Sequence, residues 1–90
     1  MQYSEHFIFY GNVQGVGFRF RAAGIAADYP IGGWIRNLPN RSVEMEIWGD
    51  KSSCTAFLDE LLIEMGSLIH RTDRQKCPPV NKPLHFEIRH

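Results

Sequence analysis

GNVQGVGFR, residues 11–19, separates an apolar strand from a helix and decides how the rest of the chain is read. Three glycines in these first seven residues allow the backbone to curl and to direct several N–H groups toward one point. The helix that begins at Phe18 adds its own unpaired N–H groups and the positive end of its dipole. Arg19, in the first turn, adds a forked and permanently charged donor. The stretch therefore predicts an anion site, and phosphate is the anion we expect.

Hydrophobic periodicity changes on the two sides of this loop. Residues 5–12 contain the continuous apolar run Phe7–Tyr10, which is typical of a central strand. Residues 18–29 follow helical spacing, and the helix is expected to end before Pro30 because a residue that precedes proline resists helical geometry. The loop is thus predicted to connect a strand to a helix.

The remaining chain divides into alternating elements. A strand is expected at 32–37, a tight turn at Leu38–Arg41, and an alternating strand at 42–48, and these form a hairpin. We expect a second helix at 52–65, a strand within 67–75, a proline-rich loop at 77–83 and a last strand at 84–89.

This order predicts an α+β fold, a ferredoxin-like βαββαβ sandwich that forms one domain over residues 1–90. An antiparallel sheet is expected to carry both helices on one face. The right-handed crossover rule makes the first and second strands parallel, so their carboxyl ends lie at one end of the sheet. The loop, Arg19 and Asn37 are therefore expected to converge, although the numbering separates them.

Composition limits the classes of function. Ten basic and ten acidic side chains cancel, which argues against nucleic-acid partners and against anionic membranes. The apolar run near the N-terminus is too short for a membrane span or a signal peptide. Cys54 and Cys77 show no metal-type spacing, and neither do the four histidines. We expect reduced thiols in a cytoplasmic protein, with no metal and no demand for more than a monomer.

The chemistry available at the loop is sparse. Arg19 can hold two oxygens of a phosphate, and Asn37 can orient a water molecule but cannot deprotonate it. No His, Asp or Glu falls within 11–19 or 32–37, and the loop contains no Ser or Cys nucleophile. An ordinary phosphate ester requires an acid, a metal or a covalent step, whereas an acyl phosphate releases a carboxylate with a reference pKa of about 4. The residues therefore favour an acyl phosphate as substrate.

Two motifs carry a resemblance to a known family. Residues 11–19, followed by Gly33-Trp34-Ile35-Arg36-Asn37, resemble the two signature motifs of the acylphosphatases, and the expected element order is similar across nearly the whole chain. The resemblance implies hydrolysis of the carboxyl–phosphate bond of small acyl phosphates without metal or organic cofactor. It also implies that inorganic phosphate is both product and inhibitor.

The same resemblance assigns roles to particular residues. It implies that Arg19 binds the phosphate and that Asn37 orients the attacking water. The implied phosphate loop consists of Gln14, Gly15, Val16, Gly17, Phe18 and Arg19.

The chain departs from the family pattern in two places. The hairpin turn contains Asn40-Arg41 where the family commonly has Asp-Gly. An arginine where a glycine normally takes positive φ is expected to strain the turn or to change its type, at a cost of about 1 kcal/mol. Ser67 to Lys82 lacks the usual family sequence. This second departure leaves the binding of the acyl group open.

Other functions remain as alternatives. The leading alternative is a non-catalytic module of the same fold that binds phosphate or another anion. RNA-binding domains share this strand order, but Glu44 and Glu46 occupy the strand where such domains need basic and aromatic residues. Arg21 and Arg36 are interpreted as surface charges, with Arg36 on the strand face opposite Asn37.

Overall fold

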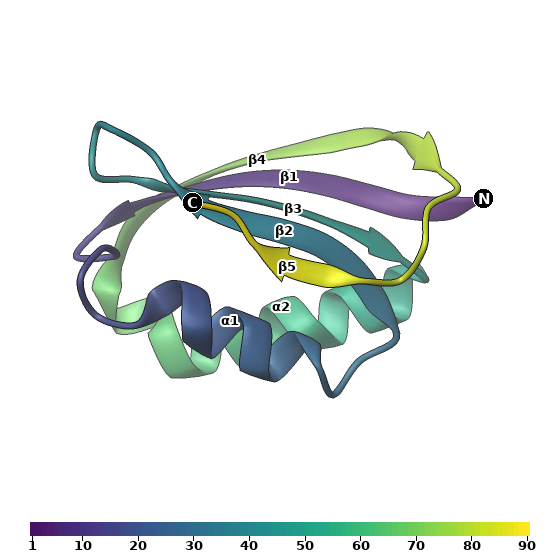
Figure 1. Ribbon diagram of the computed structural model, residues 1–90, viewed down its shortest axis with the longest axis horizontal. Helices are drawn as coiled ribbons and strands as arrows, with labels where there is room; N and C mark the ends of the chain where they lie inside the picture. The colour runs from purple at the N-terminus through teal and green to yellow at the C-terminus, as the bar shows by residue number, and fades with distance from the viewer.

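Two helices cover one face of a five-stranded sheet in the computed structural model, which describes residues 1–90 (Figure 1). The elements follow the order β1 (Gln2–Gly11), α1 (Phe18–Ala26), β2 (Ile31–Asn37), β3 (Val43–Gly49), α2 (Lys51–Met65), a short 3-10 turn (Gly66–Leu68), β4 (Ile69–Val80) and β5 (Phe86–Ile88). This arrangement confirms the predicted ferredoxin-like α+β fold. No helix is long and apolar enough to cross a membrane.

The sheet has the strand order β4-β1-β3-β2-β5, and it is mixed. The first four strands pair antiparallel, as predicted, but β5 pairs parallel to β2. The expectation of a wholly antiparallel sheet was therefore wrong for the last strand. The loop at 81–85 reverses the chain as it passes from β4 to the far edge of the sheet, so β5 runs antiparallel to β4 and consequently parallel to β2 (Figure 1).

The prolines near the C-terminus do not end β4. The predicted loop at 77–83 was wrong for residues 77–80, because β4 continues through Pro78 and Pro79 to Val80. Two facts allow this. β4 is an edge strand whose single partner is β1, and the register shifts between the pairs Gln2↔Val80 and Ser4↔Cys77. Proline is tolerated at edges and bulges because the outer N–H has no ladder partner to lose.

Apart from β4, three elements differ from expectation by two residues or more. β1 begins at Gln2 rather than at residue 5, and β5 contains only residues 86–88. α1 ends at Ala26, three residues earlier than expected. Beyond it, the N–H groups of Asp28 and Tyr29 donate to carbonyls three residues back, those of Ile25 and Ala26, instead of four. Such i→i−3 bonds commonly close a helix.

The core lies between the sheet and the helices. Seventeen buried apolar residues form one cluster, and aromatic rings connect its layers. The Phe9 ring centroid lies 5.7 Å from that of Phe7 and 5.4 Å from that of Phe18. Because Phe18 is the first residue of α1, its burial fixes the start of that helix beneath the end of β1.

One carboxylate is buried beneath α2. Glu5 is 6% exposed, accepts two hydrogen bonds from the Arg74 guanidinium at 2.7 and 3.1 Å, and accepts a third from the Tyr3 hydroxyl at 2.7 Å. Burial alone raises the pKa of Glu5, but the hydrogen bonds from Arg74 and Tyr3 outweigh it and lower the pKa below its usual value. The ionised form is therefore the one that the fold stabilises.

Removing the cation from this pair should destabilise the fold in a pH-dependent way. Arg74→Leu should lower the free energy of unfolding by about 2 kcal/mol at pH 7, less than for a fully buried pair because Arg74 is half exposed. A lowered carboxyl pKa contributes stability above the unfolded pKa and loses it as pH falls through the folded value. The deficit should therefore shrink below about pH 4.3. Urea unfolding at several pH values measures it.

Arg71→Leu is the matched control, since Arg71 lies on the same strand and pairs with the exposed Asp73. It should cost less than about 1 kcal/mol at every pH. An Arg74→Leu deficit that stays constant between pH 3 and pH 7 would contradict the assignment to Glu5.

The β2–β3 hairpin contains the strained residue that the sequence predicts. Arg41 has φ 72°, and it is the one non-glycine residue of the chain with positive φ. Its N–H donates to the Leu38 carbonyl at 3.1 Å, while the Asn40 side chain accepts from both the N–H and the hydroxyl of Ser42. The turn is thus held by its neighbours while Arg41 carries the strain.

Arg41→Gly should stabilise the protein. Glycine removes a left-handed penalty of about 1–2 kcal/mol but adds unfolded-state entropy worth about 0.4–1 kcal/mol, which leaves a net gain of about 0.5–1 kcal/mol. Asn40→Gly, the control at the adjacent residue, should destabilise because it removes the bonds to Ser42. Thermal unfolding compares the two variants, and a lower midpoint for Arg41→Gly would refute the strain.

Candidate active site

The loop and Asn37 lie at the same end of the sheet. β1 and β2 both run antiparallel to β3, which lies between them, so their carboxyl ends coincide (Figure 1). A hollow of about 180 Å³ opens there, which we call the loop hollow. It is lined by Val13, Gly15, Gly17, Phe18, Arg19, Phe20 and Asn37. The structure therefore brings Arg19, Asn37 and the loop glycines to one place.

The loop backbone presents free donors. Gly15 and Gly17 have φ 75° and 76°, a left-handed conformation that other residues adopt only with strain. Gly17 is also the N-cap residue of α1 and provides no side-chain cap. The backbone N–H groups of residues 15–20 donate to no other group of the protein. Left-handed glycines just before a helix start leave a concave set of N–H groups that suits an anion.

Contacts on its two sides hold the loop in place. Val13 is buried, and the N–H of Asn12 donates to the Leu68 carbonyl at 2.9 Å. The Gln14 amide nitrogen donates to the carbonyls of Leu38 and Ser42, each at 2.9 Å. Both of its hydrogens are thereby used, so the Gln14 side chain fastens the loop to the hairpin and does not line the loop hollow.

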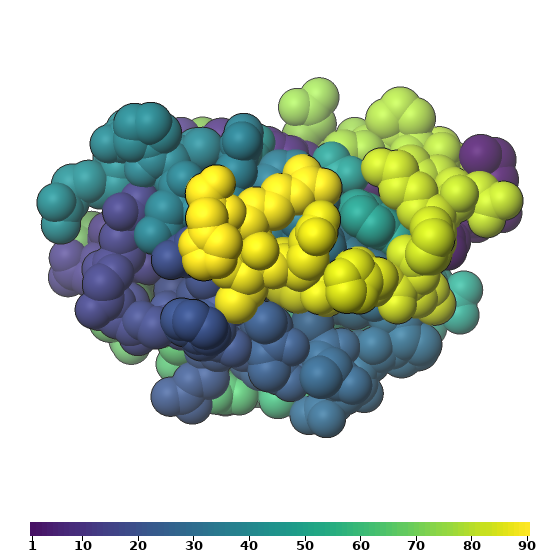
Figure 2. Space-filling view, in the orientation of Figure 1, coloured from purple at the N-terminus to yellow at the C-terminus, as the bar shows by residue number.

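Arg19 is positioned by the end of the chain. One terminal nitrogen of its guanidinium, Nη1, donates to the Arg89 carbonyl at 3.2 Å and lies 3.5 Å from Nδ1 of His90. Arg89 in turn donates its N–H to the Ile35 carbonyl on β2 at 2.8 Å. In the space-filling view, the final residues, in yellow, lie beside the dark blue start of α1 (Figure 2). The other guanidinium nitrogens remain free to bind a ligand.

Sequence reasoning missed this contact. The acceptor is a backbone carbonyl, which no residue type signals, and it reaches Arg19 only because β5 pairs parallel to β2. The parallel pairing of β5 with β2 was not predicted either, because the expected sheet was antiparallel.

Asn37 ends β2 on the side of the sheet that faces α1. It is half-buried, it shares that side with the buried Ile35, and its side-chain amide forms no hydrogen bond within the protein. Arg36 projects from the opposite face, as predicted, and its Nε donates to Glu44 at 2.6 Å. The Asn37 amide is thus available to a molecule in the loop hollow.

Two other residues of the predicted phosphate loop have different surroundings. The Phe18 side chain belongs to the core, so only its backbone faces the loop hollow as a donor. Val16 lines a larger groove on the other flank of α1 instead. Apart from Arg19, the donors that the predicted phosphate loop presents to the loop hollow are therefore backbone N–H groups.

Titratable groups with perturbed pKa lie elsewhere. Burial raises the pKa of the Cys54 thiol to about 11, and a hydrogen bond to Glu5 raises the pKa of Tyr3 to about 12. Burial raises the pKa of Glu44, but bonds from His6 and Arg36 outweigh it and lower that pKa. None of these residues lines the loop hollow, and no three His, Cys, Asp or Glu side chains are grouped as for a metal. Both cysteines are free.

Comparison of the sequence with known proteins finds similarity to acylphosphatases. A family model described as acylphosphatase matches residues 5–88. An acylphosphatase of Geobacillus kaustophilus is 38% identical over 74 residues, which cover 82% of this chain and 77% of that protein. One of Geobacillus thermodenitrificans is 39% identical over 69 residues, covering 77% and 71%.

Solved structures show the same fold. The crystal structure of acylphosphatase from Bacillus subtilis matches with a TM-score of 0.85 at 21% identity, over all of both chains. An acylphosphatase from Coxiella burnetii gives a TM-score of 0.81 at 22% identity, covering 98% of this chain and 93% of that one. Full-length HypF in a phosphate- and nucleotide-bound form gives 0.79 at 21% identity, with this chain covering 12% of it.

Proposed function

The chain belongs to the acylphosphatase family and is a hydrolase of acyl phosphates, and we propose that it works by in-line attack of water, with Arg19 and the loop holding the phosphate and Asn37 orienting the water. The observation that carries this proposal is the loop hollow. Free backbone N–H groups, a guanidinium and an unpaired amide line one space at the end of the sheet.

Phosphate binding falls to charge and backbone donors. The N–H groups of residues 15–20 and the free guanidinium nitrogens of Arg19 are the donors available in the loop hollow. Together they hold the non-bridging oxygens, whose charge is redistributed as the phosphoryl group transfers. Preorganisation supports this role, because the loop is already fastened by Gln14 and Val13 before any ligand arrives.

The Asn37 amide positions the nucleophile. Its oxygen accepts a hydrogen bond from a water molecule, which holds the water beside the phosphorus. The water oxygen forms a new P–O bond as the bond from phosphorus to the acyl oxygen breaks. The carboxylate leaves with the electron pair, and the water protons remain on the phosphate product.

The leaving group explains why so few residues suffice. A carboxylate is stable at neutral pH, since its conjugate acid has a reference pKa of about 4. No proton must therefore be delivered to it, and no residue of the loop hollow is suited to deliver one. The proposed mechanism uses no metal and no organic cofactor.

Loss of the guanidinium should impair binding and turnover together. Arg19→Ala should lower kcat/KM for benzoyl phosphate by about 10³-fold or more and should weaken inhibition by inorganic phosphate, because the guanidinium contacts both ground and transition states. Arg19→Lys should recover little, since an ammonium lacks the fork. Arg36→Ala is the control at the same end of the sheet, and steady-state kinetics with a chelator present makes the comparison. Retained phosphate inhibition in Arg19→Ala would refute the role.

Loss of the amide should separate turnover from binding. Asn37→Ala should lower kcat by about 10²- to 10³-fold while the inhibition constant of phosphate changes less than about twofold, because the amide acts chiefly on the water. Asn81→Ala, in the distant 81–85 loop, serves as control. A wild-type kcat in Asn37→Ala would remove that residue from the mechanism. A folded wild-type protein that binds phosphate without any turnover would instead point to a non-catalytic phosphate-binding module.

A further inference from the structure

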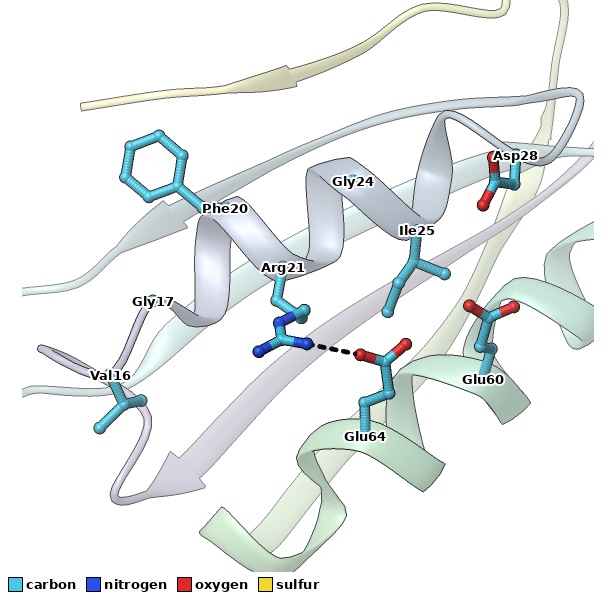
Figure 3. A pocket seen from close by; sticks show the side chains of 9 residues that line it. All are labelled: Val16, Gly17, Phe20, Arg21, Gly24, Ile25, Asp28, Glu60 and Glu64. Atoms are coloured by element: carbon cyan, nitrogen blue, oxygen red, sulfur yellow. Dashed lines mark hydrogen bonds and ion pairs between the residues drawn. The ribbon is translucent and has the colours of Figure 1, made fainter.

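A groove of about 470 Å³ adjoins the loop hollow, and the proposed reaction gives it no role so far. It lies between α1 and α2, and we call it the interhelical groove (Figure 3). Its lining consists of Val16, Gly17, Phe20, Arg21, Gly24, Ile25, Asp28, Glu60 and Glu64. Gly17 and Phe20 also line the loop hollow, so the two spaces meet at the start of α1.

In-line displacement requires that the attacking water and the leaving group occupy opposite sides of the phosphorus. Asn37 and the Arg19–Arg89 contact lie on the flank of α1 that faces β2 and β5. The interhelical groove lies on the other flank, toward α2 (Figure 3). With water held by Asn37, the acyl group leaves toward the groove.

The near end of the interhelical groove offers apolar surface. Phe20 is 70% exposed and Val16 is 45% exposed, although both are large apolar residues beside a polar loop. Figure 3 shows both near Gly17, with Val16 on the loop and the Phe20 ring projecting from α1 on the side away from α2. Exposed aromatic and aliphatic side chains next to a phosphate site are suited to contact the organic part of a phosphorylated substrate.

Gly24 keeps the surface beside Phe20 open. It lies one turn after Phe20 on the same side of α1, and a Cβ built on it meets nothing within 4 Å. Glycine within a helix is unfavourable relative to alanine, and no contact in the fold requires it here. Because helical side chains lean toward the N-terminus, any side chain at position 24 would cover the space beside the Phe20 ring.

Charge distinguishes the far end of the groove. Arg21 pairs with Glu64 at 3.0 Å, while Glu60 accepts from the neutral Tyr29 hydroxyl at 2.7 Å. Asp28 adds a carboxylate with no ion pair. The lining thus carries more negative than positive charge, which repels a second anionic group on the substrate.

We propose that the interhelical groove is the acyl-group subsite, that Phe20 and Gly24 determine its shape, and that it selects aromatic or bulky apolar acyl groups over anionic ones. This assignment rests on the proposed function, because it requires the phosphate to occupy the loop hollow. It names the substrate class as acyl phosphates with an uncharged apolar acyl group.

Filling the subsite tests the assignment. Gly24→Leu should lower kcat/KM for benzoyl phosphate about tenfold, the loss expected when one aromatic contact of about 1.4 kcal/mol is removed. Hydrolysis of acetyl phosphate, which is too short to reach residue 24, should stay within about twofold, and so should phosphate inhibition. Leucine also favours the helix, so the thermal midpoint should rise, which excludes misfolding as the cause. Gly66→Ala, at another glycine whose Cβ would meet nothing, is the matched control.

A second experiment tests whether the negative charge of the interhelical groove disfavours anionic acyl groups. Benzoyl phosphate should exceed its para-carboxy analogue in kcat/KM, and Glu60→Gln should narrow that ratio about threefold, since glutamine still accepts from Tyr29. Phe20→Ala should lower the ratio of benzoyl to acetyl activity. Equal benzoyl-to-acetyl ratios in wild type, Gly24→Leu and Phe20→Ala would overturn the subsite while leaving the proposed hydrolysis intact. Absence of hydrolysis of both benzoyl and acetyl phosphate in wild type would overturn the proposed function itself.

Discussion

Burial of Phe18 is the constraint on which the site depends. Its ring packs 5.4 Å from that of Phe9 in the core, and it is also the first residue of α1. The helix start is therefore held beneath the end of β1, and the two left-handed glycines before it must turn the backbone sharply. The N–H groups of residues 15–20 are left without partners at the end of the sheet. Hydrophobic packing thus aims the donors, and the hydrogen bonds of Gln14 to the hairpin hold the loop from its other side.

The same constraint explains which parts of the site the sequence could predict. Glycine spacing, helical periodicity and the crossover rule are local or topological, so residues 11–19 and Asn37 could be placed at one end of the sheet in advance. The hydrogen bond that Arg19 donates to the Arg89 carbonyl could not be predicted. Any residue type can supply a backbone carbonyl, and the position of this one depends on β5. Similarly, Pro78 and Pro79 argue for a loop until β4 is known to be an edge strand.

The glycines near the site have two different roles: some are needed for their backbone conformation, and one leaves space on the surface. Gly15 and Gly17 are required for their positive φ, so any replacement strains the loop. Gly24 has helical backbone, and a Cβ there would meet nothing. Its lack of a side chain lowers helix propensity and leaves the interhelical groove open beside Phe20. In the proposed mechanism, phosphate binding therefore depends on the loop backbone and Arg19, whereas the proposed acyl subsite depends on the surface of α1, so the two can change independently.

The carboxylates whose pKa the fold lowers lie apart from the proposed site. Glu5 and Glu44, whose pKa values the fold lowers, lie beneath α2 and on the open face of the sheet, away from the loop hollow. The residues proposed to act on the substrate are an amide, which does not titrate, and a guanidinium, which stays charged throughout the physiological range. Acid thus acts on the fold through these two carboxylates. A site built from backbone donors, one cation and one amide keeps its chemistry for as long as packing around Phe18 keeps its shape.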